Sequence, residues 1–184
     1  MLRQLDAWLD APGDTGWVVV TGGPGMGKSA ILSAWLTRRE RARAVVPYHL
    51  VRRQVADWDQ PAVIAASLAA QIEAAFPDCR DPAARPERRL LELLGRVSKQ
   101  HGAVRRLVVV VDGLDETQAE PGENPLPQFL PHVMPAGIRF LCATRPTYPH
   151  LNWLEARGRE RHGRRRGWRC SPRSSPRCFC GAST

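Results

Sequence analysis

The sequence predicts an α/β fold in which a mainly parallel sheet lies between two layers of helices. Short apolar, β-branched runs alternate along the chain with longer segments whose apolar residues recur at helical spacing, a pattern typical of parallel sheets. A glycine-rich loop follows the first apolar run, and an aspartate ends a later one. The length of 184 residues suits one domain with a substantial core.

The expected elements of the first half begin with an amphipathic helix over residues 1–10. A turn then leads to a strand at Trp17–Thr21, and the glycine-rich loop leads to a helix from Lys28 to about Arg41. A second strand is expected at Ala44–Val51. Pro47 favours an edge position for it, because proline has no N–H for a central ladder.

The second half continues the alternation of helices and strands. One helix is expected to begin at Pro61, since the first helical turn tolerates a missing N–H, and another covers Glu87 to about Gln100. Strands are expected at Leu107–Val111 and Ile138–Thr144, with a short helix near Gln128–Val133 between them.

Charge and composition divide the chain near residue 150. Residues 1–150 hold 18 Lys and Arg against 16 Asp and Glu, whereas residues 151–184 hold nine Arg against two Glu. Leu and Val stop after Leu154, and a segment so poor in apolar residues cannot form a core by itself. We therefore expect a folded domain over 1–150 and a disordered, Arg-rich tail over 151–184.

The sequence gives no sign of secretion or of a membrane span. No apolar run approaches the roughly 18 to 20 residues that cross a bilayer, and acidic residues interrupt the apolar pattern of the N-terminus. The five cysteines are an odd number, which argues against a disulfide framework. A cytoplasmic protein without a membrane partner is the default expectation.

The segment Gly22–Ser29 matches the phosphate-binding pattern G-x-x-x-x-G-K-[ST] in full. Glycines let the backbone curl so that N–H groups point at phosphate oxygens, and the following helix directs its positive end to the same place. Lys28 is expected to reach the β- and γ-phosphates, and the Ser29 hydroxyl to ligate Mg²⁺. The predicted cofactors are ATP or ADP with Mg²⁺, and the predicted contacts are Gly22, Gly23, Pro24, Gly25, Met26, Gly27, Lys28 and Ser29.

Three acidic residues follow the most apolar run of the chain. Asp112 ends that run, so its carboxylate can face Mg²⁺ directly or through a water molecule. Asp115 and Glu116 come three and four residues later, where either can orient an attacking water. The alternative is an ordinary Asp-Gly turn, and the presence of the P-loop makes that alternative the weaker interpretation.

Arg145 directly follows the last predicted strand. Ligands of open α/β sheets bind at the carboxyl ends of the strands, so this cation can approach the γ-phosphate and report its presence. A solvated arginine before the turn at Pro146 is equally consistent with the position alone.

Together these residues resemble the NACHT and related STAND-type P-loop NTPases, which are signal-transducing ATPases within the wider AAA+-like group. The resemblance rests on the P-loop, on the acidic sequence Asp112–Glu116 with its small second residue, and on Thr144–Pro146, which is similar to the sensor 1 of the family. The stretch Tyr48–Gln54 also resembles the second strand of the family. The resemblance covers about residues 1–150 and implies a three-layer P-loop NTPase fold.

The resemblance implies a switch that is closed with ADP and oligomeric with ATP, with slow hydrolysis at the β–γ phosphoanhydride. Two alternatives stay open: a nucleotide-binding module without turnover, and a basic, nucleic-acid-binding ATPase of the replication-initiator kind. The implied roles are phosphate contact by Gly25, Gly27, Lys28 and Ser29, metal coordination by Ser29 and Asp112, water activation by Asp115 or Glu116, and γ-phosphate sensing by Arg145.

The sequence departs from the family at its C-terminal end. The family has a fifth strand beside the P-loop strand, and nothing after Arg145 has a suitable pattern. We therefore expect a sheet that lacks its last strand and leaves Val18–Val20 at an exposed edge. We also expect a fragment of a longer protein, with self-association belonging to the full-length form.

The basic tail has three open interpretations. Residues 157–177 can bind nucleic-acid phosphates by charge, with Trp168 stacking on bases. The favoured interpretation is a solvated tail without a selected role. Zinc is a third option, although the spacing does not match an ordinary zinc finger; its ligands would be His162, Cys170, Cys178 and Cys180.

Overall fold

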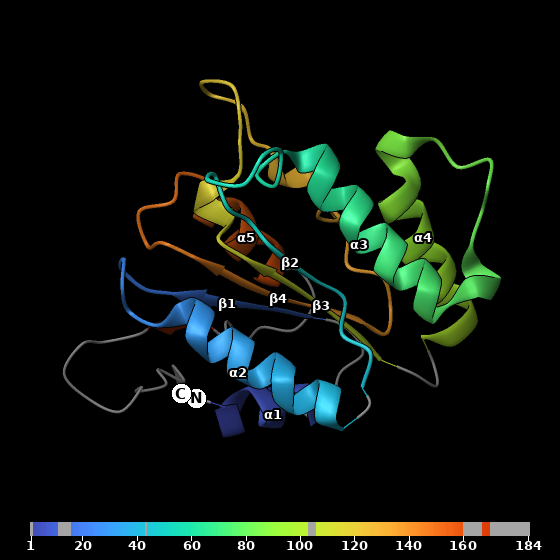
Figure 1. Cartoon of the computed structure of the whole chain (residues 1–184), viewed down its shortest axis with the longest axis horizontal. Helices are drawn as coiled ribbons and strands as arrows, with labels where there is room; N and C mark the ends of the chain where they lie inside the picture. The colour runs from blue at the N-terminus through green and yellow to red at the C-terminus, as the bar shows by residue number, and fades with distance from the viewer. Residues whose placement is uncertain (1, 11–15, 43, 103–105, 160–166, 170–184) are drawn as a thin grey trace.

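The computed structural model describes residues 2–10, 16–42, 44–102, 106–159 and 167–169. These residues form one parallel sheet with helices on both faces, which confirms the predicted α/β class (Figure 1). The strand order is β2-β3-β4-β1-β5, and every pairing is parallel. The strands are β1 (Gly16–Thr21), β2 (Tyr48–Leu50), β3 (Leu107–Asp112), β4 (Ile138–Thr144) and β5 (Gly167–Arg169).

Two separate cores lie on the two faces of the sheet, because successive side chains of a strand point to opposite faces. Val18 and Val20 pack with one layer of helices, whereas Val19 packs with the other. Figure 1 shows α1 and α2 together on one side of the sheet and α3 and α4 on the other. The helices are α1 (Leu2–Asp10), α2 (Lys28–Arg41), α3 (Pro61–Ala75), α4 (Pro86–His101) and α5 (Leu151–Arg159).

Strand β2 is shorter than the sequence predicts. Only Tyr48–Leu50 of the expected Ala44–Val51 pairs with β3, because Pro47 has no N–H to donate and contributes only its carbonyl, which accepts from Val110 N at 2.9 Å. The predicted edge position is confirmed. The Gln71 side chain covers this edge, since it accepts from the N–H of Tyr48 and donates to its carbonyl.

The expected helix near Gln128–Val133 is wrong in its position and type. A single 3₁₀ turn forms instead at Leu126–Gln128. Pro131 explains the difference, because a proline disfavours helical backbone at the residue before it, here Leu130. Leu126, Phe129 and Leu130 are nevertheless fully buried, so the apolar residues that suggested the helix do lie in the core.

The C-terminal part corrects the expectation that nothing after Arg145 lies beside the P-loop strand. Helix α5 continues the fold past residue 150 and buries Leu154 in the core. The three residues of β5 then pair in parallel with Val19–Thr21, so β1 has a neighbour on both sides. The predicted zinc ligands in the tail lie outside the described residues. No helix in the described part of the chain has the length and apolar character to cross a membrane.

Candidate functional site

The predicted site residues converge at the carboxyl ends of three adjacent strands. In the order β3-β4-β1, these strands end in Asp112, Thr144 and Thr21, directly before the acidic turn, Arg145 and the P-loop. Backbone hydrogen bonds join the three ends, because Gly22 N donates to Thr144 O at 3.4 Å and Gly113 N donates to Ala143 O at 3.1 Å. Segments far apart in the sequence therefore meet at one edge.

The P-loop adopts a conformation that requires glycine at two positions. Gly25 and Gly27 have φ values of 70° and 75°, in the left-handed region that side chains disfavour. A Cβ at either residue would meet no atom within 4 Å, so the backbone angle, not crowding, calls for glycine. Helix α2 begins directly after Gly27, and its N-terminal N–H groups open toward the loop.

Lys28 lies folded against its own loop. Its Nζ donates to Gly22 O at 2.7 Å and to Gly23 O at 3.1 Å. Both acceptors are neutral backbone carbonyls of the loop itself. The structure therefore places a cation at the point where the sequence predicts the phosphates.

Asp112 is buried, with 5% of its surface exposed, at the end of β3. Burial raises the pKa of its carboxyl above the ordinary value, while the hydrogen bond from Ser29 and the charge of Lys28 lower it and the nearby Asp115 and Glu116 raise it further. Ser29, in the first turn of α2, is thus in direct contact with Asp112 at the end of β3. A hydroxyl and a carboxylate are oxygen ligands of the kind that Mg²⁺ prefers, so the pair fits the predicted metal.

Asp115 is held by Arg145. The Arg145 Nε lies 2.8 Å from Asp115 Oδ2, and the Arg145 backbone N donates to Asp115 Oδ1 at 3.0 Å. The buried Thr144 hydroxyl donates to the same Oδ1 at 3.3 Å. Both carboxylate oxygens of Asp115 are therefore engaged, which the sequence did not predict.

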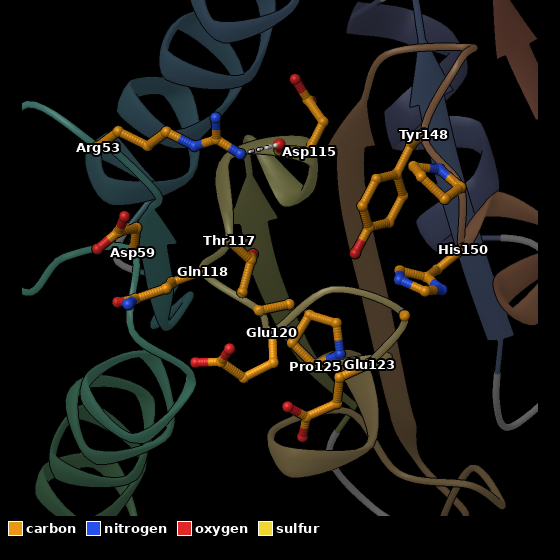
Figure 2. Close-up of a pocket in the computed structure, with 13 residues that line it drawn as sticks. Arg53, Asp59, Asp115, Thr117, Gln118, Glu120, Glu123, Pro125, Tyr148 and His150 are labelled. Atoms are coloured by element: carbon orange, nitrogen blue, oxygen red, sulfur yellow. Dashed lines mark hydrogen bonds between the residues drawn. The ribbon is translucent and has the colours of Figure 1, made fainter.

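Glu116 completes a 3₁₀ turn that begins at Leu114. Gly113 precedes this turn with a φ of 82°, and a Cβ there would lie 3.0 Å from Val51 O, so both angle and space require glycine. The loop after β2 braces the turn from outside, because Arg53 donates to the backbone oxygen of Glu116 at 3.1 Å. It also donates to the backbone oxygen of Asp115 at 3.2 Å (Figure 2). Arg53 is a residue of this site that no sequence motif indicated, although it lies in the stretch Tyr48–Gln54.

A family model described as "Nephrocystin 3, N-terminal" matches residues 2–145. The chain belongs to the nephrocystin 3 N-terminal family. The match covers the P-loop, the acidic turn and Arg145, which are the segments that the strand ends bring together. A search of the curated proteins gave no match.

Two solved structures share the fold of this nephrocystin 3 N-terminal family member. The Orc1 protein of Aeropyrum pernix, solved in complex with DNA, is 17% identical with a TM-score of 0.54 and covers 94% of this chain. Cdc6p from Pyrobaculum aerophilum is 14% identical with a TM-score of 0.51 and covers 93%. This chain spans 44% of the length of each. The family match and the shared fold support a P-loop NTPase-type domain.

Proposed function

We propose that this member of the nephrocystin 3 N-terminal family binds ATP with Mg²⁺ and acts as a nucleotide-dependent switch. The contact between Ser29 and the buried Asp112, beside the cation of Lys28, is the observation that carries the proposal. A structural glycine turn would not need a carboxylate buried against its last residue. Taking a charge out of water is unfavourable unless a ligand or an ion compensates it.

Each part of the site has a proposed task. The N–H groups of the loop and of the first turn of α2 bind the phosphate oxygens. Lys28 exchanges its loop carbonyls for the β- and γ-phosphates, as the P-loop pattern implies. Ser29 and Asp112 hold Mg²⁺, which supplies positive charge to the phosphates when bound. ATP and ADP are both expected to bind.

For turnover, we propose Glu116 as the acid that orients the attacking water. Water would attack the γ-phosphorus in line, the bond from that phosphorus to the bridging oxygen would break, and ADP would leave. Asp115 is the weaker candidate for this role, because both of its oxygens already hold Thr144 and Arg145. We propose instead that Asp115 positions Arg145.

The pair of Asp115 and Arg145 also supports the switch part of the proposal. The Arg145 side chain is 47% exposed, whereas that of Asp115 is 12% exposed, so the arginine can leave while the carboxylate stays. A γ-phosphate would compete with Asp115 for the guanidinium, and ADP would not. The resemblance to STAND-type NTPases favours the same ATP-dependent change.

Thermal unfolding with Mg-ATP tests the binding proposal. A ligand at 100 times its Kd stabilises a protein by about 2.7 kcal/mol, so Mg-ATP should raise the melting temperature of the wild-type chain. Lys28→Ala should lose the increase. Lys99→Ala is a matched control, because it removes an exposed lysine from the far end of α4. An unchanged wild-type melting temperature, or the same increase in Lys28→Ala, contradicts the proposal.

A further inference from the structure

A hollow lies beside the proposed nucleotide site and shares Arg53 and Asp115 with it. It has a volume of about 470 Å³ and lies between the loop after β2, the acidic loop after β3 and the loop after β4 (Figure 2). Its lining includes Asp115 but no residue of Gly22–Ser29. This volume is within the range of about 300–1,000 Å³ that is common for ligand pockets.

Two residues that line this pocket carry a buried hydroxyl without a hydrogen-bond partner among the described residues. Tyr148 is 9% exposed and Thr117 is 6% exposed, and both Tyr148 Oη and Thr117 Oγ1 lack a partner there. Figure 2 shows the Tyr148 hydroxyl pointing across the pocket toward Thr117. Buried polar groups are nearly always hydrogen-bonded in folded proteins, so this pair is suited to receive a polar ligand.

The charges around the pocket are mainly negative. Asp59, Glu120 and Glu123 contribute three carboxylates to the lining, and Arg53 is its one arginine. Arg53 donates to the backbone oxygens of Asp115 and Glu116, so its side chain is directed at the acidic turn and not at these three carboxylates. A smaller neighbouring hollow is lined by the same two glutamates, Glu120 and Glu123.

We propose that this pocket binds an arginine side chain from a peptide segment of a partner protein. A guanidinium has five N–H donors and no acceptor, which suits carboxylates and hydroxyl oxygens that accept. Its flat faces can pack against the Tyr148 ring and the adjacent Pro125 and Pro149. This site goes beyond the proposed nucleotide function, and its test needs no nucleotide.

Calorimetric titration of the full chain with N-acetyl-argininamide, without nucleotide, at pH 7.5 and low salt, tests the proposal. We expect saturable binding that is weaker for N-acetyl-lysinamide, because the lysine ammonium lacks the planar array of N–H donors that a guanidinium has. The double change Glu120→Gln with Glu123→Gln should weaken binding by about tenfold or more. Glu87→Gln, an exposed acid on α4, is the control and should leave binding unchanged.

The hydroxyls are tested by Thr117→Val and Tyr148→Phe, which keep size and remove the oxygen. Each should weaken argininamide binding by about threefold to tenfold, whereas hydroxyls with a purely structural role would leave it unchanged. Saturable binding that none of these variants weakens would overturn the proposal. So would the absence of saturable argininamide binding, or binding of inorganic phosphate in its place. Mg-ATP binding in the same samples is read separately and does not affect these outcomes.

Discussion

The ionised carboxylate of Asp112 is buried, and its burial reduces the stability of the fold. Burial raises its pKa above the ordinary value of 3.8, so the folded chain holds this proton more tightly than the unfolded chain does. The loss of folding free energy is absent below pH 3.8, grows as the pH rises from there to the raised pKa of the folded state, and is constant above it. Functional sites commonly carry such costs, because the ligand compensates them only when it is bound.

Asp112→Asn should therefore stabilise the chain without ligand by about 0.5–2 kcal/mol at neutral pH. The difference in melting temperature between the variant and the wild type should grow from pH 4 to pH 7. Thermal unfolding over this range, without Mg²⁺ or nucleotide, measures it. The same variant should lose the effect of Mg²⁺ on nucleotide binding. A variant that is less stable than the wild type at every pH contradicts the assignment.

Single-turnover hydrolysis of ATP should distinguish the proposed roles of Glu116 and Asp115. Glu116→Gln should lower the rate by about 10²- to 10⁴-fold, as expected for a group that assists proton transfer, and leave ATP affinity nearly unchanged. Asp115→Asn should instead change the preference for ATP over ADP, because it frees Arg145. The rates come from rapid quench and the affinities from equilibrium titration. A larger rate loss in Asp115→Asn than in Glu116→Gln would reverse the two roles.

The sequence indicated which segments meet at this edge of the sheet better than it indicated which of their side chains pair. The P-loop could be identified because all its determinants lie within eight consecutive residues, and Asp112 because it ends a wholly apolar run. The ion pair and hydrogen bond between Asp115 and Arg145 join residues that are 30 positions apart in the sequence. Such side-chain contacts depend on which strands are neighbours in the sheet, and no local sequence pattern determines that order. The bracing role of Arg53 was missed for the same reason.

At the scale of elements, α3 and α4 are joined by a charged pair as well as by apolar packing. Glu73, buried on α3, accepts from Arg89 on α4 through both of its carboxylate oxygens. Arg80 adds a longer contact at 3.8 Å. The hydrogen bonds from Arg89 hold the pKa of Glu73 below its ordinary value of 4.5. The pair therefore contributes stability above pH 4.5 and loses it as the pH falls through the lowered pKa.

Glu73→Gln should reduce the free energy of unfolding by about 1–2 kcal/mol at pH 7, since charged hydrogen bonds are worth more than neutral ones but Arg89 is partly exposed. Urea unfolding at pH 7 and at pH 3 measures the loss, which should be smaller at the lower pH. Glu92→Gln is the control, because its exposed pair with Arg88 within one helix should be worth about 0.5 kcal/mol or less. Equal losses in the two variants contradict the argument.

Regular elements could be predicted where periodicity and end signals agree. Helices α3 and α4 begin at prolines, and their apolar stripes face the sheet. The prediction failed where proline interrupts an apolar run, as at Pro47 and Pro131, because backbone restriction outweighs apolar pattern there. Strand β5 had no apolar or alternating signal. Its three residues pair through backbone groups, which every residue has.

For the whole molecule, the pairing of β5 with β1 closes an edge next to the P-loop strand. Truncation after Arg159 removes β5, whereas truncation after Arg169 keeps it. The shorter chain should be less stable by about 1–3 kcal/mol and should self-associate more, because the bare edge of β1 can pair with another chain. Thermal unfolding and light scattering compare the two proteins. The same stability and mass in both truncations would show that β5 does not protect the edge.

The strand order also sets when the nucleotide site can form during synthesis. The register pairs Gly16 with Arg139, so β1 waits for β4 before it has a neighbour from the body of the sheet. At about 5–20 residues per second, a ribosome needs roughly 6 to 25 s to make the intervening chain. Throughout that delay the apolar strand β1, which precedes the P-loop, has not yet paired with β4. The strands that carry the proposed nucleotide site are therefore among the last to pair as the chain is made.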